Sequence, residues 1–171
     1  KEIKSFKMNR GEIKMSNAPY SGIIRDHVGY VSLTTFTQDA GKNIADAIKT
    51  MKKDDPLLKG VILDLRDNGG GLLMEAINIV NIFVPNGVEV VSTRGKVRDW
   101  DKTFTTQRPA LDETLPVVVL INKHSASASE IVSGAIQDLD RGVIIGQRSY
   151  GKGLVQNTKD IGFNSKLKLT T

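Results

Sequence analysis

The sequence predicts an α/β fold with a largely parallel sheet and flanking helices. Three observations lead to this class. Short apolar runs of strand length alternate with longer segments of helical periodicity, as in β-α-β units. The length of 171 residues suits one domain. With 39% hydrophobic and 25% charged residues, the composition is that of a globular protein rather than a disordered one.

The core is expected to span residues 29–171, after an amino-terminal arm or linker formed by residues 1–28. Within the arm, Glu12–Met15 is a candidate strand, and residues 17–22 have the composition of a turn. The core then opens with Gly29–Leu33, which has strand character.

A helix and a strand follow. Thr37 or Asp39 can cap a helix that runs to about Lys53, because four apolar residues recur at the spacing of one helical face: Ile44, Ala47, Ile48 and Met51. The sequence Asp-Asp-Pro then ends this helix. The apolar run Gly60–Leu65 is typical of a buried strand.

The middle of the chain combines a second helix with an exposed segment. Leu72–Phe83 is apolar almost all round, which predicts a well-buried helix. Val88–Ser92 is a predicted strand. Residues 94–114 are polar and of mixed charge, so we expect them to form an exposed hairpin or loop.

The last third alternates strands with one more helix. Pro116–Ile121 is the clearest buried strand of the sequence. We expect Ser127–Leu139 to be helical and Gly142–Gly146 to be a strand. Leu154–Gln156 and Lys166–Thr170 are further candidate strands.

Three loops are predicted to meet at one edge of the sheet. Parallel strands end at the same edge, and ligands bind there in α/β folds. The loops that leave predicted strand ends are residues 66–71, 122–126 and 148–153. We therefore expect the functional residues to lie in or beside these three loops.

The first loop places Gly69, Gly70 and Gly71 ahead of a helix. Glycine allows positive φ and lets backbone N–H groups approach a ligand closely, which suits an oxyanion. A tight turn accounts for the same residues without any chemistry. The dinucleotide fingerprint Gly-x-Gly-x-x-Gly is absent from this loop.

The second loop leads into a helix through the sequence Ser-Ala-Ser-Ala-Ser-Glu, residues 125–130. Ser127 and Glu130 match a Ser-x-x-Glu capping box, which needs no catalytic role. The alternative is a serine hydroxyl at the positive end of the helix, with the Ala128 N–H beside it. These residues alone leave both interpretations open.

The third loop, residues 146–153, nearly matches the phosphate-binding pattern Gly-x-x-x-x-Gly-Lys-[Ser/Thr]. Nucleotide binding is the weaker interpretation, because Gly153 replaces the hydroxyl residue and a strand-like segment follows in place of a helix. Lys152 can instead point inward as a functional amine. A serine nucleophile needs a base, and the candidates are Lys152, in a site whose burial favours the neutral amine, and His124.

The composition excludes several other classes of function. The absence of cysteine excludes disulfides, zinc–thiolate sites and a cysteine nucleophile, and two histidines offer little for a metal site. The formal net charge is +5, but only 5% of residues are aromatic and the basic residues are scattered, so we expect no nucleic-acid partner. No apolar run reaches the roughly 20 residues that span a bilayer.

Three motifs together resemble the carboxyl-terminal processing, or tail-specific, serine peptidases. They are Asp-Leu-Arg-Asp-Asn-Gly-Gly-Gly-Leu at residues 64–72, Asn-Lys-His-Ser-Ala-Ser-Ala-Ser-Glu at residues 122–130, and Ser-Tyr-Gly-Lys-Gly at residues 149–153 followed by Gln156. The resemblance covers residues 28–171. It implies a crotonase-like α/β core and an endopeptidase that cuts polypeptides near their carboxyl ends, with no metal or organic cofactor.

The same resemblance implies roles for individual residues. Ser127 would be the nucleophile that forms an acyl-enzyme, Lys152 the general base, and Gln156 a residue that assists the lysine. The amides of Ala128 and a loop glycine, Gly71 or less favourably Gly70, would form the oxyanion hole. A fully extended chain would hold residues 152 and 156 about 13 Å apart, so direct contact between them requires a coiled backbone.

The sequence also departs from the family pattern. The PDZ domain that usually precedes this core does not fit in residues 1–28, and the family continues beyond Thr171, so an incomplete catalytic domain is expected. Bacterial relatives act in the cell envelope, which predicts a periplasmic or other extracytoplasmic location, and a homo-oligomer is compatible with the sequence. A non-catalytic peptide-binding or scaffolding domain with the same fold is the alternative; it predicts that Lys152 points to solvent.

Overall fold

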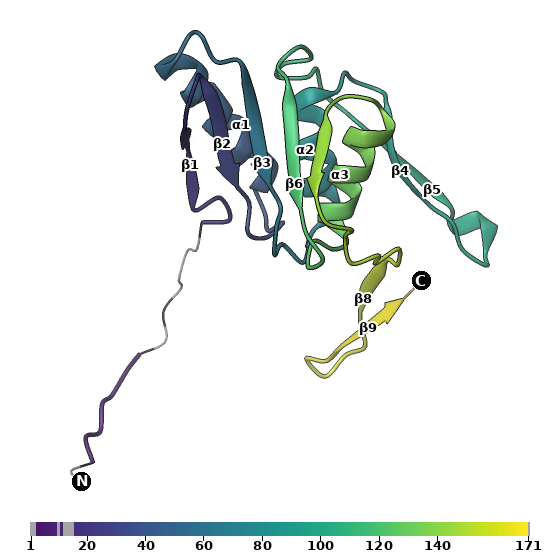
Figure 1. Cartoon of the computed structure of the whole chain (residues 1–171). Helices are drawn as coiled ribbons and strands as arrows, with labels where there is room; N and C mark the ends of the chain where they lie inside the picture. Colours follow the sequence, from purple (N-terminus) through teal and green to yellow (C-terminus); the bar gives the residue numbers. More distant parts are fainter. Residues whose placement is uncertain (1–2, 10, 12–15, 171) are drawn as a thin grey trace.

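The computed structural model describes residues 3–9, 11 and 16–170 (Figure 1). The candidate strand Glu12–Met15 lies outside these residues. The elements of the described chain, in order, are β1 (Tyr20–Ile23), β2 (Val28–Ser32), α1 (Ala40–Asp54), β3 (Gly60–Asp64), α2 (Leu73–Phe83), β4 (Glu89–Thr93), the 3-10 helix η1 (Arg98–Trp100), β5 (Lys102–Thr105), β6 (Val117–Ile121), α3 (Ala128–Asp138), β7 (Val143–Gly146), β8 (Gln156–Asp160) and β9 (Lys166–Thr170).

A five-stranded sheet in the order β1-β2-β3-β6-β7 forms the centre of the molecule. Strands β2, β3, β6 and β7 run parallel, and only β1 is antiparallel. This confirms the predicted fold class. The carboxyl ends of the parallel strands meet at one edge, since Ser32 pairs with Asp64, Asp64 with Leu120, and Ile121 with Gly146.

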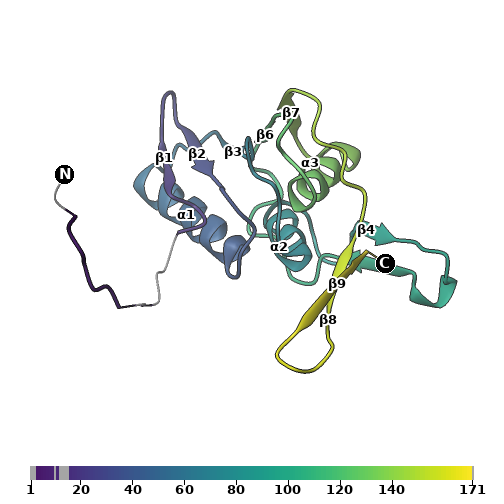
Figure 2. The ribbon, with the colours of Figure 1, turned by 90° about the horizontal axis from the view of Figure 1, so that it is seen from below.

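The hydrophobic core lies between this sheet and three helices on one of its faces (Figure 2). The apolar face predicted for α1 packs into the core, since Ile44, Ile48 and Met51 are buried. Helix α2 is buried over most of its surface, as its apolar sequence predicts. The other face of the sheet is open at its β7 edge, where the Val143 and Ile145 side chains are 58% and 52% exposed.

Three segments differ from the sequence-based expectation. Residues 17–22, predicted as a turn, lead into strand β1, which pairs with β2 and so extends the sheet to residues before 29. Strand β4 is not part of the main sheet but pairs with β5, so the hairpin expected within residues 94–114 begins earlier, at Glu89, and its second strand ends at Thr105. The predicted strand Leu154–Gln156 begins only at Gln156, so residues 152–155 are irregular.

Strand pairing across the chain explains these differences. Tyr20 contacts the ring of Tyr30 on β2, and a short polar segment gains strand structure only through such a partner. Among the described strands, β8 and β9 likewise pair with each other alone, as a hairpin that projects from the carboxyl edge of the sheet (Figure 1).

Candidate active site

A cavity of about 320 Å³ opens at the carboxyl edge of the sheet. Its lining comes from the predicted glycine loop, from Ser127 directly after the second loop, from the third loop and from the β8–β9 hairpin. The residues that line it are Gly69, Gly70, Gly71, Leu73, Ser127, Lys152, Leu154, Val155, Gln156 and Lys168. The structure therefore brings the predicted nucleophile, base and glycine loop to one place.

Ser127 occupies a strained backbone position directly before helix α3. Its φ of 57° and ψ of −114° lie outside the regions that a serine ordinarily adopts. Such a conformation costs on the order of 1–3 kcal/mol and persists only where the surrounding structure enforces it. The strained turn places the half-buried Ser127 at the cavity wall, at the positive end of the helix.

The neighbouring serines have structural roles. Ser125 is buried and donates its hydroxyl to the Leu65 carbonyl at 2.8 Å, while accepting the Asn122 N–H at 2.9 Å. Ser129 is also buried, and its hydroxyl donates to the Asn68 carbonyl at 2.8 Å. Of the three serines in the motif, only Ser127 lines the cavity.

Gly70 packs directly against the Ser127 turn. Its φ of 95° lies in the left-handed region. A Cβ at this position would lie 2.6 Å from the Ala126 carbonyl oxygen, 2.8 Å from the Ala128 nitrogen and 2.9 Å from the Ser127 Cβ. Both the backbone conformation and the close approach therefore require glycine here.

Asn68 joins the glycine loop to the serine turn, a role that the sequence analysis missed. Its buried side chain donates to the Leu33 carbonyl at 2.7 Å and accepts the Gly70 N–H at 2.9 Å. Its carbonyl accepts the Ala126 N–H at 3.1 Å. The sequence held one signal for this role, because asparagine readily bonds the backbone N–H two residues further on.

The backbone amides differ in their availability to a ligand. The Gly70 N–H already donates to Asn68. No hydrogen-bond acceptor contacts the N–H of Gly71 or of Ala128 within the described part of the chain. A free N–H is expected for Ala128, since the first amides of a helix have no partner in the helix.

Lys152 reaches the cavity from the third loop. Its side chain is half-buried, and its backbone N–H donates to the Glu130 carboxylate at 2.8 Å. Gly151, with a φ of 87°, turns the chain just before it. Lys152 and Ser127 line the same cavity, but no hydrogen bond joins the Lys152 amine to the Ser127 hydroxyl in the described structure.

Gln156 is exposed at the start of β8 and also lines the cavity. Residues 152–155 lie outside any regular element, and Lys152 and Gln156 both line the cavity despite their spacing in the sequence. Lys168 enters the cavity lining from the opposite strand of the same hairpin, and the sequence analysis gave it no role.

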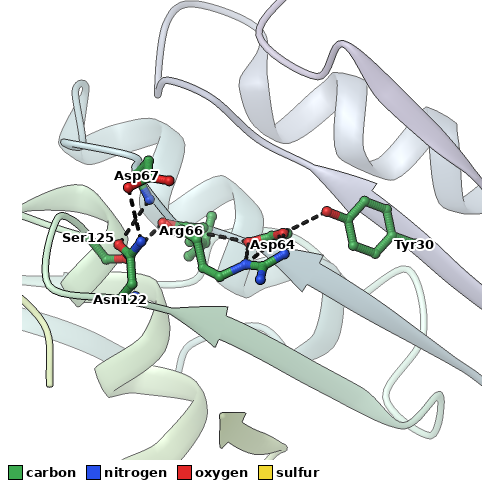
Figure 3. A network of polar contacts seen from close by, with 7 residues as sticks. Tyr30, Asp64, Arg66, Asp67, Asn122 and Ser125 are labelled. Carbon is green, nitrogen blue, oxygen red and sulfur yellow. Dashed lines mark hydrogen bonds and ion pairs between the residues drawn. The ribbon is translucent and has the colours of Figure 1, made fainter. Parts of the chain in front are cut away.

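A polar network joins the first two loops to each other and to strand β2 (Figure 3). Asp67 and Asn122 bond each other twice, at 3.0 and 2.9 Å, and so join the first loop to the second. Asp64 is buried and accepts bonds from the Arg66 guanidinium and, at 2.6 Å, from the Tyr30 hydroxyl. Burial opposes ionisation of Asp64, but these hydrogen bonds outweigh it and hold the pKa of its carboxyl below the ordinary value.

The competing residues lie elsewhere. His124 is exposed and does not line the cavity. His27, the other histidine, is half-exposed and contacts Asp55 at 2.7 Å. Gly153 leads into the β8–β9 hairpin, so no helix N-terminus follows the phosphate-like pattern in the described residues up to Thr170.

The described residues offer neither a metal site nor a membrane span. They contain no group of three or more histidine, aspartate or glutamate side chains arranged to hold a metal ion. None of their helices is both long enough and apolar enough to pass through a lipid bilayer.

A serine at a helix start, a lysine in the same cavity and nearby glycine amides are the combination of groups that serine hydrolases use. The sequence model of peptidase family S41 matches residues 27–171. The chain therefore belongs to peptidase family S41, which includes the carboxyl-terminal processing serine peptidases that its motifs resemble.

Individual relatives agree with this assignment. The chain is 42% identical to a carboxy-terminal-processing protease of Bartonella bacilliformis over 168 residues, which are 97% of this chain and 38% of the relative. It is 36% identical to a probable CtpA-like serine protease of Staphylococcus aureus, covering 99% of this chain and 33% of that protein. The chain thus spans about a third of the length of these relatives.

Solved structures show the same architecture. The photosystem II D1 C-terminal processing protease matches with a TM-score of 0.71 and 33% identity, over 84% of this chain and 36% of that one. A putative S41 protease from Bacteroides fragilis matches with a TM-score of 0.75 at 18% identity, over 92% of this chain and 45% of that one. The fold is therefore the crotonase-like α/β core expected from the motifs.

Proposed function

We propose that this chain carries the catalytic centre of a serine endopeptidase that cleaves polypeptides near their carboxyl ends. One observation carries the proposal: Ser127, Lys152 and the glycine loop line a single cavity at the carboxyl edge of the sheet. The 42% identity to a carboxy-terminal-processing protease supports the choice of substrate. Because the chain spans only part of such relatives, the activity is proposed for the longer protein that contains it.

The proposed reaction begins with attack by Ser127. Its Oγ forms a bond to the scissile carbonyl carbon while the neutral Lys152 amine takes the hydroxyl proton. The C–N bond then breaks, and the Lys152 ammonium returns this proton to the leaving amine. Water attacks the resulting ester, its proton passes through Lys152 to the Ser127 oxygen, and the acid product leaves. Each step balances without a cofactor.

Two amides are suited to the developing oxyanion. The Ala128 and Gly71 N–H groups have no other acceptor in the described structure, whereas the Gly70 N–H is used by Asn68. This supports Ala128 and Gly71 as the oxyanion donors. One such donor lowers the activation free energy by roughly 3–4 kcal/mol. Gln156 stays the proposed assistant of Lys152. We expect substrate to bind extended, as an added strand, and the longer protein to act outside the cytoplasm.

The test is peptidase assay of the full-length protein beside its Ser127→Ala and Lys152→Ala variants. We expect each change to reduce kcat by at least about 10³-fold, because nucleophile and base act as a unit. His124→Ala, on the same loop system but outside the cavity, is the matched control and should retain activity. Peptidase activity in Ser127→Ala would rule out Ser127 as the nucleophile. If His124→Ala loses activity while Lys152→Ala retains it, His124 is the base instead of Lys152.

A further inference from the structure

Glu130 lies in the first turn of α3 and bonds two catalytic segments at once. One carboxylate oxygen, Oε2, accepts the backbone N–H of Ser127 at 2.8 Å and that of Lys152 at 2.8 Å. The proposed nucleophile and the proposed base therefore share a single acceptor atom, although they are distant in sequence. The sequence analysis assigned Glu130 only a capping role.

The second carboxylate oxygen holds the same loop. Oε1 accepts the Ser149 hydroxyl at 2.8 Å and the Gly151 N–H at 2.6 Å. Together the two oxygens receive four hydrogen bonds, three of them from the loop that carries Lys152. A capping box requires only the contact to Ser127, so the other three contacts exceed what helix capping explains.

Little else holds this loop on its outer side. The Tyr150 N–H donates to the Ser125 carbonyl at 3.0 Å. A Cβ added to Gly151 or to Gly153 would meet open space. Within the described structure, Glu130 is therefore the main polar anchor of residues 149–152.

The ionised form of Glu130 suits its role as the acceptor of these four hydrogen bonds. Burial opposes its ionisation, but hydrogen bonds from Ser149 and from the Lys152, Ser127 and Gly151 amides keep the pKa of Glu130 below its ordinary value. All four contacts come from donors, so only a group with two accepting oxygens can satisfy them together.

We propose that Glu130 is a positioning residue, which sets the distance between the Ser127 hydroxyl and the Lys152 amine by holding both backbones on one carboxylate. The proposal rests on the proposed Ser127–Lys152 function. Glu130 touches no reacting atom in it. Misplacement of reacting groups by about 1 Å is enough to cost roughly 100-fold in rate.

The test is Glu130→Gln in the full-length protein. Glutamine has the same shape but replaces one accepting oxygen with an NH₂ donor, so two of the four contacts are lost. We expect kcat to fall by roughly 100-fold with KM changed less than about threefold, because the alignment of the reacting groups is altered and the substrate contacts are not. Circular dichroism and a thermal melt report whether the variant is folded.

Glu75→Gln is the matched control. Glu75 also lies in the first turn of a helix and accepts a backbone N–H, that of Gly41 on α1, at 2.7 Å, but it has no contact with the Lys152 loop. It should keep kcat within about twofold of wild type. Ser149→Ala removes one of the four contacts to Glu130 and should cause a smaller loss than Glu130→Gln.

The outcomes separate this proposal from the one on which it rests. Inactive Ser127→Ala and Lys152→Ala with a fully active Glu130→Gln would overturn the positioning role alone, whereas an active Ser127→Ala would remove its basis. An equal loss in Glu75→Gln would also overturn it, as would a rise in KM with kcat unchanged. If Glu130→Gln does not fold, Glu130→Asp keeps the charge on a shorter side chain, and an unchanged kcat in that variant would overturn the proposal.

Discussion

The two walls of the cavity are built in different ways. The wall that carries Ser127 is part of the core: the Asn68 and Ser129 side chains are completely buried, and Ala128 is 1% exposed. The wall that carries Lys152 continues into a hairpin in which every residue of β8 is exposed. Leu154 is 62% exposed and Phe163 fully so.

This difference indicates how each half of the site is positioned. Buried packing and backbone hydrogen bonds hold the nucleophile and the glycine amides, which keeps oxyanion donors in place before substrate binds. The base depends on a few polar contacts, chiefly those to Glu130. Substitutions in the first wall should therefore reduce stability and activity together, and those in the second wall should reduce activity alone.

Among the substitutions that compare the two walls without removing a catalytic side chain, the largest effect is expected for Gly70→Ala, in the buried wall. The new Cβ would collide with the Ser127 turn, and alanine at a φ of 95° is strained. We expect at least a roughly 100-fold loss of kcat/KM in the full-length protein, together with a lower melting temperature.

Gly69→Ala is the matched control for this change. Its Cβ would meet no atom within 4 Å, and its φ is not in the left-handed region. It should change activity by less than about threefold. Equal losses at the two positions would show that the close approach of Gly70 is not what matters.

Asn68→Ala is expected to have the next largest effect. It leaves the Leu33 carbonyl and the Gly70 N–H without their buried partner, which should lower the free energy of unfolding by about 2–4 kcal/mol. Urea denaturation measures this change. Gln156→Ala, on the exposed wall, should stay within about 0.5 kcal/mol of wild type. A comparable loss of stability for Gln156→Ala would contradict the contrast between the walls.

The smallest effect concerns acid stability. Because the pKa of folded Asp64 lies below its ordinary value, the unfolded chain takes up this proton first as the pH falls. The stabilisation is present above the unfolded value of about 3.9 and is lost as the pH falls through the folded pKa. Urea denaturation between about pH 6 and pH 3 should therefore show a shallower loss of stability in Asp64→Asn than in wild type. Asp160→Asn, on the exposed hairpin, should follow the wild-type slope.

Elements with strong local patterns were predicted well. The apolar runs at Gly60–Leu65 and Pro116–Ile121 and the stripe on α1 report burial directly, so these segments agree with the structure to within about one residue. Strand β1 and the start of β8 were missed, because their pairing partners lie elsewhere in the chain and their own sequences are polar or mixed.

The candidate site also contains residues that local patterns identify and residues whose roles depend on distant partners. Ser127, Lys152 and the glycine loop were found because parallel strands deliver their loops to one edge and because three motifs coincide. Asn68 and Glu130 received no such role, since their hydrogen bonds join residues that are far apart in the sequence.

The amino-acid sequence by itself determined the α/β class, the peptidase family and the residues to examine, because periodicity and motif spacing are local properties of the chain. Only the tertiary structure decided that Asn68 ties the glycine loop to Leu33, that Ser127 sits in a strained turn, and that one carboxylate joins the serine and lysine segments. Those facts depend on which distant donors and acceptors the packed core brings within hydrogen-bond distance.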